Sequence, residues 1–512
     1  MATLSRSHFG SSVLVCFNGS QTEWRMDPQD TLYLQIAQTL AASIRTGVLA
    51  RGERLPSLRD LATQHGVSLS TAVQAYRALE DMRLVETRPR SGFFVAARAP
   101  RPPEPETTQP PSDSREVDID ALAAHTLRFA HEQGYISFGA AGPSDELFSI
   151  ERIRRTVMRA AQRHRAVLCH YALGSGHETL RRAIARYALR LGCQLQPHDI
   201  VATNSCLESI TLCLRAVTRP GDIVALESPT YFGFLEILQS LHLRALEIPT
   251  HPRDGLSLDA LELALDTQPV KALLISPTLS NPSGGSLPTT ERRRLARMVA
   301  ARGIAMIEDV LHNDLAEQED KRRAVRAFDP TGHVMLCGSF SKTIAPGLRV
   351  GWVEAGRWTE PVRRMKMATS GSQTTFVELA MAELLGYVGN EAGFRQMRHT
   401  IAQRVDEARR LIAGSFPKGI RVTDPAGGYI LWVEMPRDVD SQALFTAALA
   451  ERIAIAPGTL FSASDRYRHC VRLGVGGRWD DTQRHALMRV GALARALVAA
   501  APSQVPPMSN AA

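Results

Sequence analysis

The chain has 512 residues, of which 44% are apolar and 22% charged, and its formal net charge is +8 with a pI near 9.3. This length predicts about three domains of ordinary size, and the sequence contains no run of about 18 apolar residues, which argues against a membrane protein. The seven cysteines are scattered and include no CxxC pair, so they argue against a disulfide framework or a metal site and favour a reducing cytoplasm.

Residues 1–28 are predicted to be a disordered leader. The stretch from Ser11 to Phe17 is apolar but too short for the core of a signal peptide, so we expect no export signal. Met26 begins the first patterned segment, and the true start could therefore be either Met1 or Met26.

Residues 29–97 are predicted to form a small domain of three helices followed by two strands. Apolar residues recur at helical spacing in the first helix, which we expect to end near Gly47, at Leu32, Ile36, Leu40 and Ile44. Ser57 can cap a helix over 58–65, Gly66 supplies a turn, and Ser70 can cap a third helix over 71–81. Residues 84–87 and 92–95 read as strands around a basic turn at 88–91.

This order of helix, turn, helix and wing predicts that double-stranded DNA is a partner. Between Arg45 and Arg101 there are ten arginines and five acids, a local net charge of +5, although the chain prefers arginine everywhere and the cluster could be an ordinary solvated surface. Four residues of the third helix are candidates for contacts with base edges: Ser70, Thr71, Gln74 and Arg77. Three arginines are better placed to neutralise phosphates: Arg59, Arg88 and Arg90.

Residues 98–117 are predicted to be a linker, because the sequence APRPPEPETTQPPSDS is rich in proline and too poor in apolar residues to pack a core. In residues 118–500, helical patterns alternate with short apolar runs at 222–226, 271–275 and 305–309, which predicts an α/β domain with a parallel sheet. Residues 501–512 are predicted to be a disordered tail.

One lysine stands in a setting that suggests imine chemistry. Lys342 lies in SFSKTIAPGLRVGW, among hydroxyl residues, glycine and arginine, after a short apolar strand. An aldehyde cofactor needs an amine nucleophile, its phosphate needs hydroxyl and arginine donors, and a pyridine nitrogen needs a carboxylate. A lone lysine is more often a solvated surface residue, so the prediction of imine chemistry depends on the other motifs in the sequence.

Those parts resemble the MocR-type regulators of the GntR family, which join a winged helix-turn-helix to an aminotransferase-like domain of fold type I. The resemblance covers residues from about 30 to 490. It rests on two segments in the head, LPSLRDLATQHGVSLSTAVQAYRALE and RPRSGFFV, and on a series in the body: YALGSGHETLRRAIARY, TNSCLESI, ESPTYFG, NPSGG, IEDVLHNDL, SFSKTIAPGLRVGW, GGYILWVEMP, APGTLFS and HCVRLGVGG.

The resemblance implies pyridoxal 5′-phosphate as cofactor and assigns a role to each matching residue. Lys342 would form the internal aldimine, and Asp309 would pair with the pyridine nitrogen. Asn281 would hydrogen-bond the ring hydroxyl, and Tyr231 would stack on the ring. The phosphate would be held by a group of hydroxyl, amide and cationic donors: Ser205, Cys206, Ser339, Ser341 and Arg349.

The resemblance also implies a homodimer, since Tyr171 would reach the phosphate of the neighbouring subunit, and Arg472 would take the carboxylate of an amino acid. Two residues depart from the pattern. Ser205 stands where relatives have a glycine, and His312 stands where a tyrosine usually adjusts the aldimine pKa.

The function so implied is a DNA-binding transcription regulator in which an amino compound exchanges with Lys342 to form an external aldimine. The exchange would shift the body between two arrangements, and the linker would convey the shift to the head. Two alternatives stay open: an active aminotransferase that carries a DNA-binding head, and a sensor of pyridoxal phosphate itself.

Overall fold

The computed structural model describes residues 32–96, 102–119, 126 and 128–500, except for 47, 51, 82–83, 89–90, 131, 171–173 and 388–389. The chain divides into two compact units, residues 1–98 and 99–512, which we call the head and the body. The predicted leader and the predicted tail lie outside the described residues. Every helix among the described residues is too short or too polar to cross a bilayer.

The head consists of three helices and a hairpin: α1 (Leu32–Thr46), α2 (Leu58–His65), α3 (Leu69–Asp81), β1 (Val85–Arg88) and β2 (Gly92–Val95). Its core includes Leu61, Tyr76 and Leu79, none of which is exposed to solvent. Tyr76 packs on Phe93 of the hairpin with ring centroids 4.4 Å apart, and its hydroxyl donates to the carbonyl of Pro56 at 2.6 Å. The hairpin is thereby held against α3.

The caps of α2 and α3 explain where these helices begin. Ser57 caps α2 as predicted, and the side chain of Asp60 accepts a hydrogen bond from the Ser57 amide in return. The predicted cap of α3 is wrong: the helix begins at Leu69, and Ser68 rather than Ser70 accepts a hydrogen bond from the Thr71 amide, at 3.1 Å. Ser70 therefore lies inside the first turn, with its side chain exposed.

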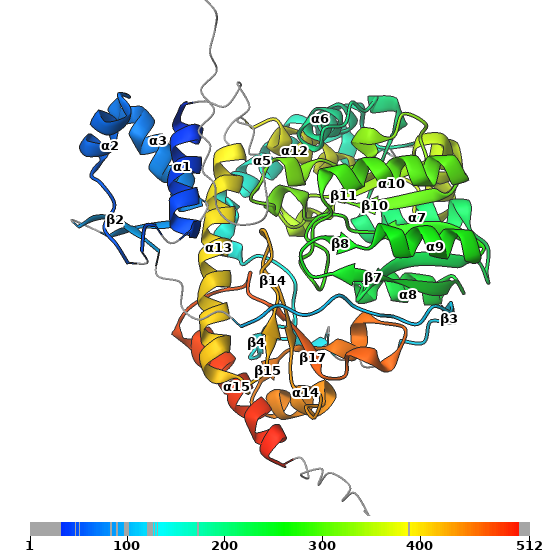
Figure 1. Ribbon diagram of the computed structural model, residues 1–512. Helices are drawn as coiled ribbons and strands as arrows, with labels where there is room; N and C mark the ends of the chain where they lie inside the picture. Colours follow the sequence, from blue (N-terminus) through cyan, green and yellow to red (C-terminus); the bar gives the residue numbers. More distant parts are fainter. Residues whose placement is uncertain are drawn as a thin grey trace, which may run out of the picture. The chain divides into compact units, whose positions relative to one another are not determined.

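The core of the body is a mostly parallel sheet, with nine strands among the described residues (Figure 1). Its strands are β3 (Arg115–Glu116), β5 (Ile200–Thr203), β6 (Ile223–Ser228), β7 (Arg244–His251), β8 (Gly255–Leu256), β9 (Val270–Ile275), β10 (Ala305–Asp309), β11 (Val334–Ser339) and β12 (Gly351–Glu354). Their order is β3-β7-β6-β9-β10-β11-β12-β5, and β8 pairs with β7. The three predicted strands are β6, β9 and β10, whereas β12, which no pattern singled out, runs antiparallel to both neighbours.

Helices cover both faces of this sheet, which is why its central strands are apolar on both sides. Along β6, Val224 and Leu226 belong to one core cluster, and Ile223 and Ala225 belong to another. The helices of this lobe are α5 (Ile150–Arg163), α6 (Glu178–Ala188), α7 (Cys206–Val217), α8 (Phe232–Ser240), α9 (Leu258–Thr267), α10 (Thr289–Arg302), α11 (Thr359–Thr369) and α12 (Thr375–Leu385).

A second lobe is built on a smaller antiparallel sheet in the order β13-β14-β17-β16. Its strands are β13 (Arg421–Val422), β14 (Ile430–Glu434), β16 (Ala456–Pro457) and β17 (Cys470–Gly474), and β15 (Ile453–Ala454) pairs with β4 (Ile136–Ser137). Its helices are α13 (Asn390–Ser415), α14 (Ser441–Ala450) and α15 (Asp481–Ala500). The long α13 extends beside the smaller sheet in Figure 1.

The predicted linker is extended between residues 102 and 119, but it is not a free spacer. It runs along the body, and Arg115–Glu116 pair with β7 as the edge strand of the large sheet (Figure 1). Hydrogen bonds from its backbone and polar side chains hold this segment against the body. A segment that is poor in apolar residues can attach in this way without a hydrophobic contact.

Candidate functional site

The residues that the sequence singled out in the body gather where strands of the large sheet end. Asp309 is the last residue of β10 and Ser339 the last of β11, and Lys342 follows three residues later. Because β10 and β11 are neighbouring parallel strands, their carboxyl ends lie at the same edge of the sheet. Ligands of open α/β sheets bind at that edge.

Lys342 is a partly buried residue. Its Nζ donates to the carbonyl oxygen of Ala141. Burial, followed by the positive charges of Arg472 and Arg349, lowers the pKa of Lys342 to about 8, against the opposite effect of Asp309. A substantial fraction of this amine is therefore unprotonated, and nucleophilic, near neutral pH.

Asp309 is a buried carboxyl group held in a fixed position. Its Oδ1 accepts a hydrogen bond from the Leu311 amide at 2.8 Å and another from the Cys206 thiol at 3.2 Å. Burial raises the pKa of Asp309 to about 6, against the effect of these two hydrogen bonds and of the Lys342 charge. A cation at this position would restore the ionised carboxylate.

The first turn of α7 lies beside these groups and offers backbone amides. Ser205 is its N-cap, with a side chain that accepts from the Glu208 amide at 3.1 Å, so the hydroxyl already has a partner. Its backbone is extended, with φ of −168°, a conformation that any residue adopts. Serine in place of glycine therefore introduces no strain here, and the cap leaves the amides of Cys206 and Leu207 at the open end of the helix.

Three more predicted donors come from the end of β11 and the segment after it. The Ser339 hydroxyl donates to that of Ser341 at 3.0 Å, which orients both. Arg349 has a left-handed backbone with φ of 52°, an arrangement that non-glycine residues rarely adopt and that is found at functional sites. Its side chain is exposed, its Nη1 lies 3.4 Å from the Pro346 carbonyl, and its charge is near enough to lower the pKa of Lys342.

Arg472, on β17, is a buried cation near the same site. Its Nη1 lies 3.5 Å from Oδ1 of Asn281, its Nη2 donates to the carbonyl of Gly139, and its guanidinium lies 5.2 Å from the ring centroid of Phe461. Nε has no hydrogen-bond partner, and in the described part of the chain no carboxylate forms an ion pair with this residue. A buried cation without an anion is a site for an anionic ligand.

Tyr231 is the N-cap residue of α8, and its ring contacts Phe232 and Phe234, with centroids 4.8 and 5.5 Å away. Burial raises its pKa to about 12, and Arg472, Asp309 and Cys206 are among the charged or polar groups that act on it. The ring thus belongs to the same cluster as the groups above.

His312 is buried and neutral, since burial and the charges of Lys342 and Arg472 lower its pKa to about 3. A neutral imidazole has one N–H donor and one acceptor nitrogen. The hydroxyl of Tyr429 lies 3.4 Å from Nε2 of His312 and 3.4 Å from the Ala141 carbonyl. The side chain of His312 is therefore held beside Tyr429 and Ala141.

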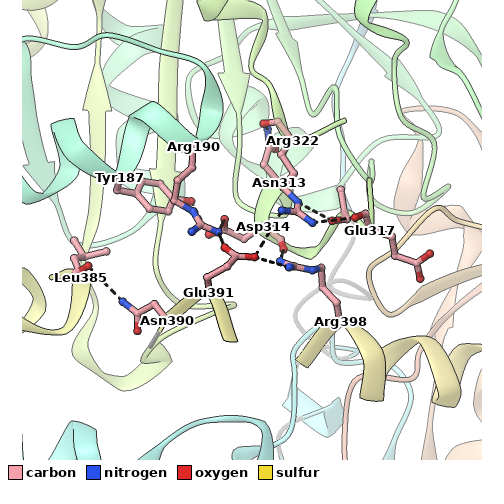
Figure 2. A network of polar contacts seen from close by, with 11 residues as sticks. Tyr187, Arg190, Asn313, Asp314, Glu317, Arg322, Leu385, Asn390, Glu391 and Arg398 are labelled. Carbon is pink, nitrogen blue, oxygen red and sulfur yellow. Dashed lines mark hydrogen bonds and ion pairs between the residues drawn. The ribbon is translucent and has the colours of Figure 1, made fainter. Parts of the chain in front are cut away.

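A network of ion pairs fixes the turn that follows His312 (Figure 2). The buried Asp314 accepts from the Tyr187 hydroxyl at 2.8 Å and from Arg190 at 3.4 Å. Arg398 of α13 donates to the backbone carbonyl of Asp314 at 2.9 Å and to Glu391 at 2.8 Å, and Glu391 also pairs with Arg190. The network ties the site to the helix that leads into the second lobe.

In the head, the predicted base-contacting residues share one face of α3. Ser70, Gln74 and Arg77 have exposed side chains and Thr71 is partly exposed, as the spacing of three to four residues allows. Arg59 is exposed in the first turn of α2. Arg88 is exposed at the end of β1, where it pairs with Glu86 at 2.7 Å and lies 4.4 Å from the Phe94 ring.

Two predicted residues, Arg90 and Tyr171, lie outside the described residues. Three features of the pocket were missed from sequence: the Ala141 carbonyl, the Cys206 thiol and Tyr429. A backbone carbonyl gives no sequence signal. The thiol and Tyr429 stand in two of the noted segments, TNSCLESI and GGYILWVEMP, but their partners come from distant parts of the chain. Among the described residues, no group of three or more His, Cys, Asp or Glu could hold a metal ion.

Comparisons with known proteins match both units. Residues 141–489 match the family of aminotransferases of class I and II, and residues 32–95 match the family of bacterial regulatory proteins called gntR. The chain is 36% identical over 466 residues to the uncharacterized HTH-type transcriptional regulator YjiR of Escherichia coli K12, an alignment that covers 90% of this chain and 98% of the relative. It is 27% identical to the 2-aminoadipate transaminase of Thermus thermophilus, over 73% of this chain and 93% of the relative.

A solved structure with the same fold as the body is LysN, the α-aminoadipate aminotransferase of Thermus thermophilus, complexed with N-(5′-phosphopyridoxyl)-L-leucine. The TM-score is 0.68 and the identity 26%, over 74% of this chain and 98% of that one. The family match over residues 141–489 includes the site residues from Ser205 to Arg472.

Proposed function

Because this chain belongs to the MocR-type regulators of the GntR family, with a DNA-binding head and an aminotransferase-like domain for pyridoxal 5′-phosphate, we propose that it senses an amino compound in the cofactor pocket. The single observation that carries this proposal is the partly buried Lys342 amine, with its pKa lowered to about 8, in a chain that also has a winged helix-turn-helix.

The groups present fit the cofactor. Bound pyridoxal phosphate supplies an aldehyde that condenses with primary amines. Lys342 is an amine ready to react, Asp309 is a fixed carboxyl group that a pyridinium nitrogen would keep ionised, and the open end of α7 offers amides to a phosphate. Ser339, Ser341 and Arg349 add hydroxyl and cationic donors beside it.

The remaining pocket residues take the roles that the resemblance implies. Tyr231 would stack on the ring, and Asn281 would donate to the ring hydroxyl. Arg472 would bind the carboxylate of the amino compound, which its missing anion and unpartnered Nε support. His312 would fix the position of Tyr429, whose hydroxyl lies 3.4 Å from the His312 Nε2.

In the head, Ser70, Thr71, Gln74 and Arg77 would contact base edges, whereas Arg59, Arg88 and Arg90 would contact phosphates. The exposure of the described members of both groups supports this division. The domain boundaries that we propose are a head over 29–97, a linker over 98–117 and a body over 118–500. We place the protein in the cytoplasm, where its DNA target is.

We also propose a homodimer, in which Tyr171 reaches the partner's cofactor phosphate. Large apolar side chains are exposed on the segment that leads to Tyr171: Ile150 at 55%, Met158 at 49% and Leu168 at 55%. A second copy could cover this surface. Light scattering combined with size-exclusion chromatography tests the dimer, and a monomer at micromolar concentration would contradict it.

The test of sensing has two parts. Amino acids are added one at a time to the cofactor-loaded protein, and changes in its visible absorbance band identify those that react. Duplexes selected from a random pool then serve to measure DNA affinity with and without each reacting compound. Sensing predicts a change of about 5- to 150-fold, the usual range of coupling between sites. An unchanged affinity for every reacting compound contradicts the proposal.

One observation favours a second function, an active aminotransferase, since the body resembles transaminases over nearly their whole length. Steady release of a keto acid product in the same experiment would support it. A response of DNA affinity to pyridoxal phosphate alone would instead support a sensor of the cofactor.

A further inference from the structure

Residues 103–116, which we call the strap, are bonded to both lobes of the body. At its beginning, the Pro103 carbonyl accepts from the Val422 amide at 2.8 Å, and the Glu104 side chain accepts from the Asp424 amide at 3.2 Å. These partners belong to or follow β13 of the second lobe. Glu104 also pairs with Arg253, in the large lobe.

Further along, the strap reaches the large sheet through Thr108. The Thr108 amide donates to the Thr250 carbonyl at 3.0 Å, and the Thr250 amide donates to the Thr108 hydroxyl at 2.8 Å. That hydroxyl in turn donates to the Ser228 carbonyl at 2.7 Å. Thr108 therefore uses its hydroxyl as donor and acceptor at once, and these two hydrogen bonds are partly buried against the buried Thr250.

Ser228 is the point at which the strap meets the cofactor pocket. It ends β6, and Tyr231 follows it by three residues. The Ser228 hydroxyl is also fixed, since it donates to the buried Glu247 at 2.6 Å and lies 2.9 Å from the hydroxyl of Tyr467 in the second lobe. The carbonyl side of Ser228 is held by Thr108 and Thr250.

We propose that Thr108 of the strap is a positioning residue of the cofactor pocket: through Ser228 it fixes the segment that carries Tyr231. Occupancy of the pocket and docking of the strap then stabilise each other. Coupling of this kind is reciprocal, so the factor by which cofactor favours docking equals the factor by which docking favours cofactor.

The inference deepens the proposed function, on which it rests, by giving the pocket a mechanical contact with the chain next to the head. The strap begins seven residues after Ala96, the last described residue of the head. A ligand that moves Tyr231 or the second lobe would thus release or tighten the strap, because both are bonded to it.

The test compares Thr108→Val, which removes the hydroxyl at nearly constant volume, with Thr107→Val at the neighbouring exposed position. The dissociation constant of pyridoxal phosphate is measured from the visible band. We expect it to rise about 3- to 10-fold in Thr108→Val, as for the loss of one hydrogen bond, and to stay unchanged in Thr107→Val. Thr108→Ser keeps the hydroxyl and should restore the affinity.

Docking of the strap has its own readout, which is cleavage by trypsin after Arg115, detected as a new N-terminus at Glu116. Pyridoxal phosphate should slow this cleavage in the parent and in Thr107→Val, but much less in Thr108→Val. Equal affinities in the two valine variants, failure of Thr108→Ser to restore affinity, or cleavage that does not depend on pyridoxal phosphate in the parent would each overturn the inference.

Neither measurement contains DNA or an amino compound. If these measurements show no coupling between the strap and the pocket, the proposal of sensing is not refuted, because the DNA titration tests it separately. Conversely, a DNA affinity that stays unchanged with every reacting amine refutes sensing but does not refute the coupling between Thr108 and the cofactor.

Discussion

The reactivity of Lys342 should follow a pKa of about 8 rather than that of an ordinary lysine, 10.5. At pH 7.5, a group with a pKa of 8 is about one quarter unprotonated, whereas one with a pKa of 10.5 is about 0.1% unprotonated. The environment of Lys342 therefore raises the concentration of reactive amine roughly 200-fold at this pH. Its largest cause is burial, followed by the charges of Arg472 and Arg349.

The assay follows the reaction of cofactor-free protein with pyridoxal, which lacks the phosphate and so does not depend on phosphate contacts. The rate of appearance of the visible band is measured between pH 6 and 10. We expect the rate to rise with pH and to level off above a midpoint near 8. In Arg349→Gln the midpoint should lie higher, because a positive charge that disfavours the protonated amine has been removed.

Lys342→Ala serves as the control that assigns the band to this residue. A midpoint above about 9.5 in the parent protein would mean that Lys342 is solvated like a surface lysine, and it would refute the reasoning from burial. An unchanged midpoint in Arg349→Gln would refute only the contribution of that charge.

Three further changes test the local structure. Ser57→Ala removes the N-cap of α2 and should destabilise the head by about 1 kcal/mol, measured as faster hydrogen exchange of the α2 amides in the full chain; unchanged exchange would contradict the cap. Tyr187→Phe removes a hydrogen bond to the buried Asp314 and should lower the free energy of unfolding by about 1.5–3 kcal/mol, and a double-mutant cycle with Asp314→Asn should show coupling; additive losses would exclude the interaction. Gly351→Ala places a Cβ 2.5 Å from the backbone of Ser205, which must displace the first turn of α7, so pyridoxal phosphate should bind at least tenfold more weakly; unchanged affinity in a spectral titration would rule out the proposed phosphate site.

Local signals explain why much of the fold could be predicted from the sequence. Ser57 and Gly66 mark the ends of α2, because a side-chain oxygen satisfies the first amides and glycine accepts the left-handed conformation, here with φ of 62°. The apolar runs of β6, β9 and β10 predict strands that are buried on both faces. The cap of α3 was misplaced by two residues, because Ser68 and Ser70 are both able to cap and only the path of the chain selects one.

The sequence by itself determined the kinds of groups in the pocket and the family, since Lys342, Asp309 and Arg349 stand in recognisable segments. Only the tertiary structure decided the pKa values of these groups. The pKa values of Lys342 and His312 are lowered by burial and by the charge of Arg472 on β17, which lies more than a hundred positions from either residue in the sequence. The strap was likewise invisible, because its hydrogen bonds lead to Thr250 and Ser228, and a proline-rich segment gives no sign of which surface will accept them.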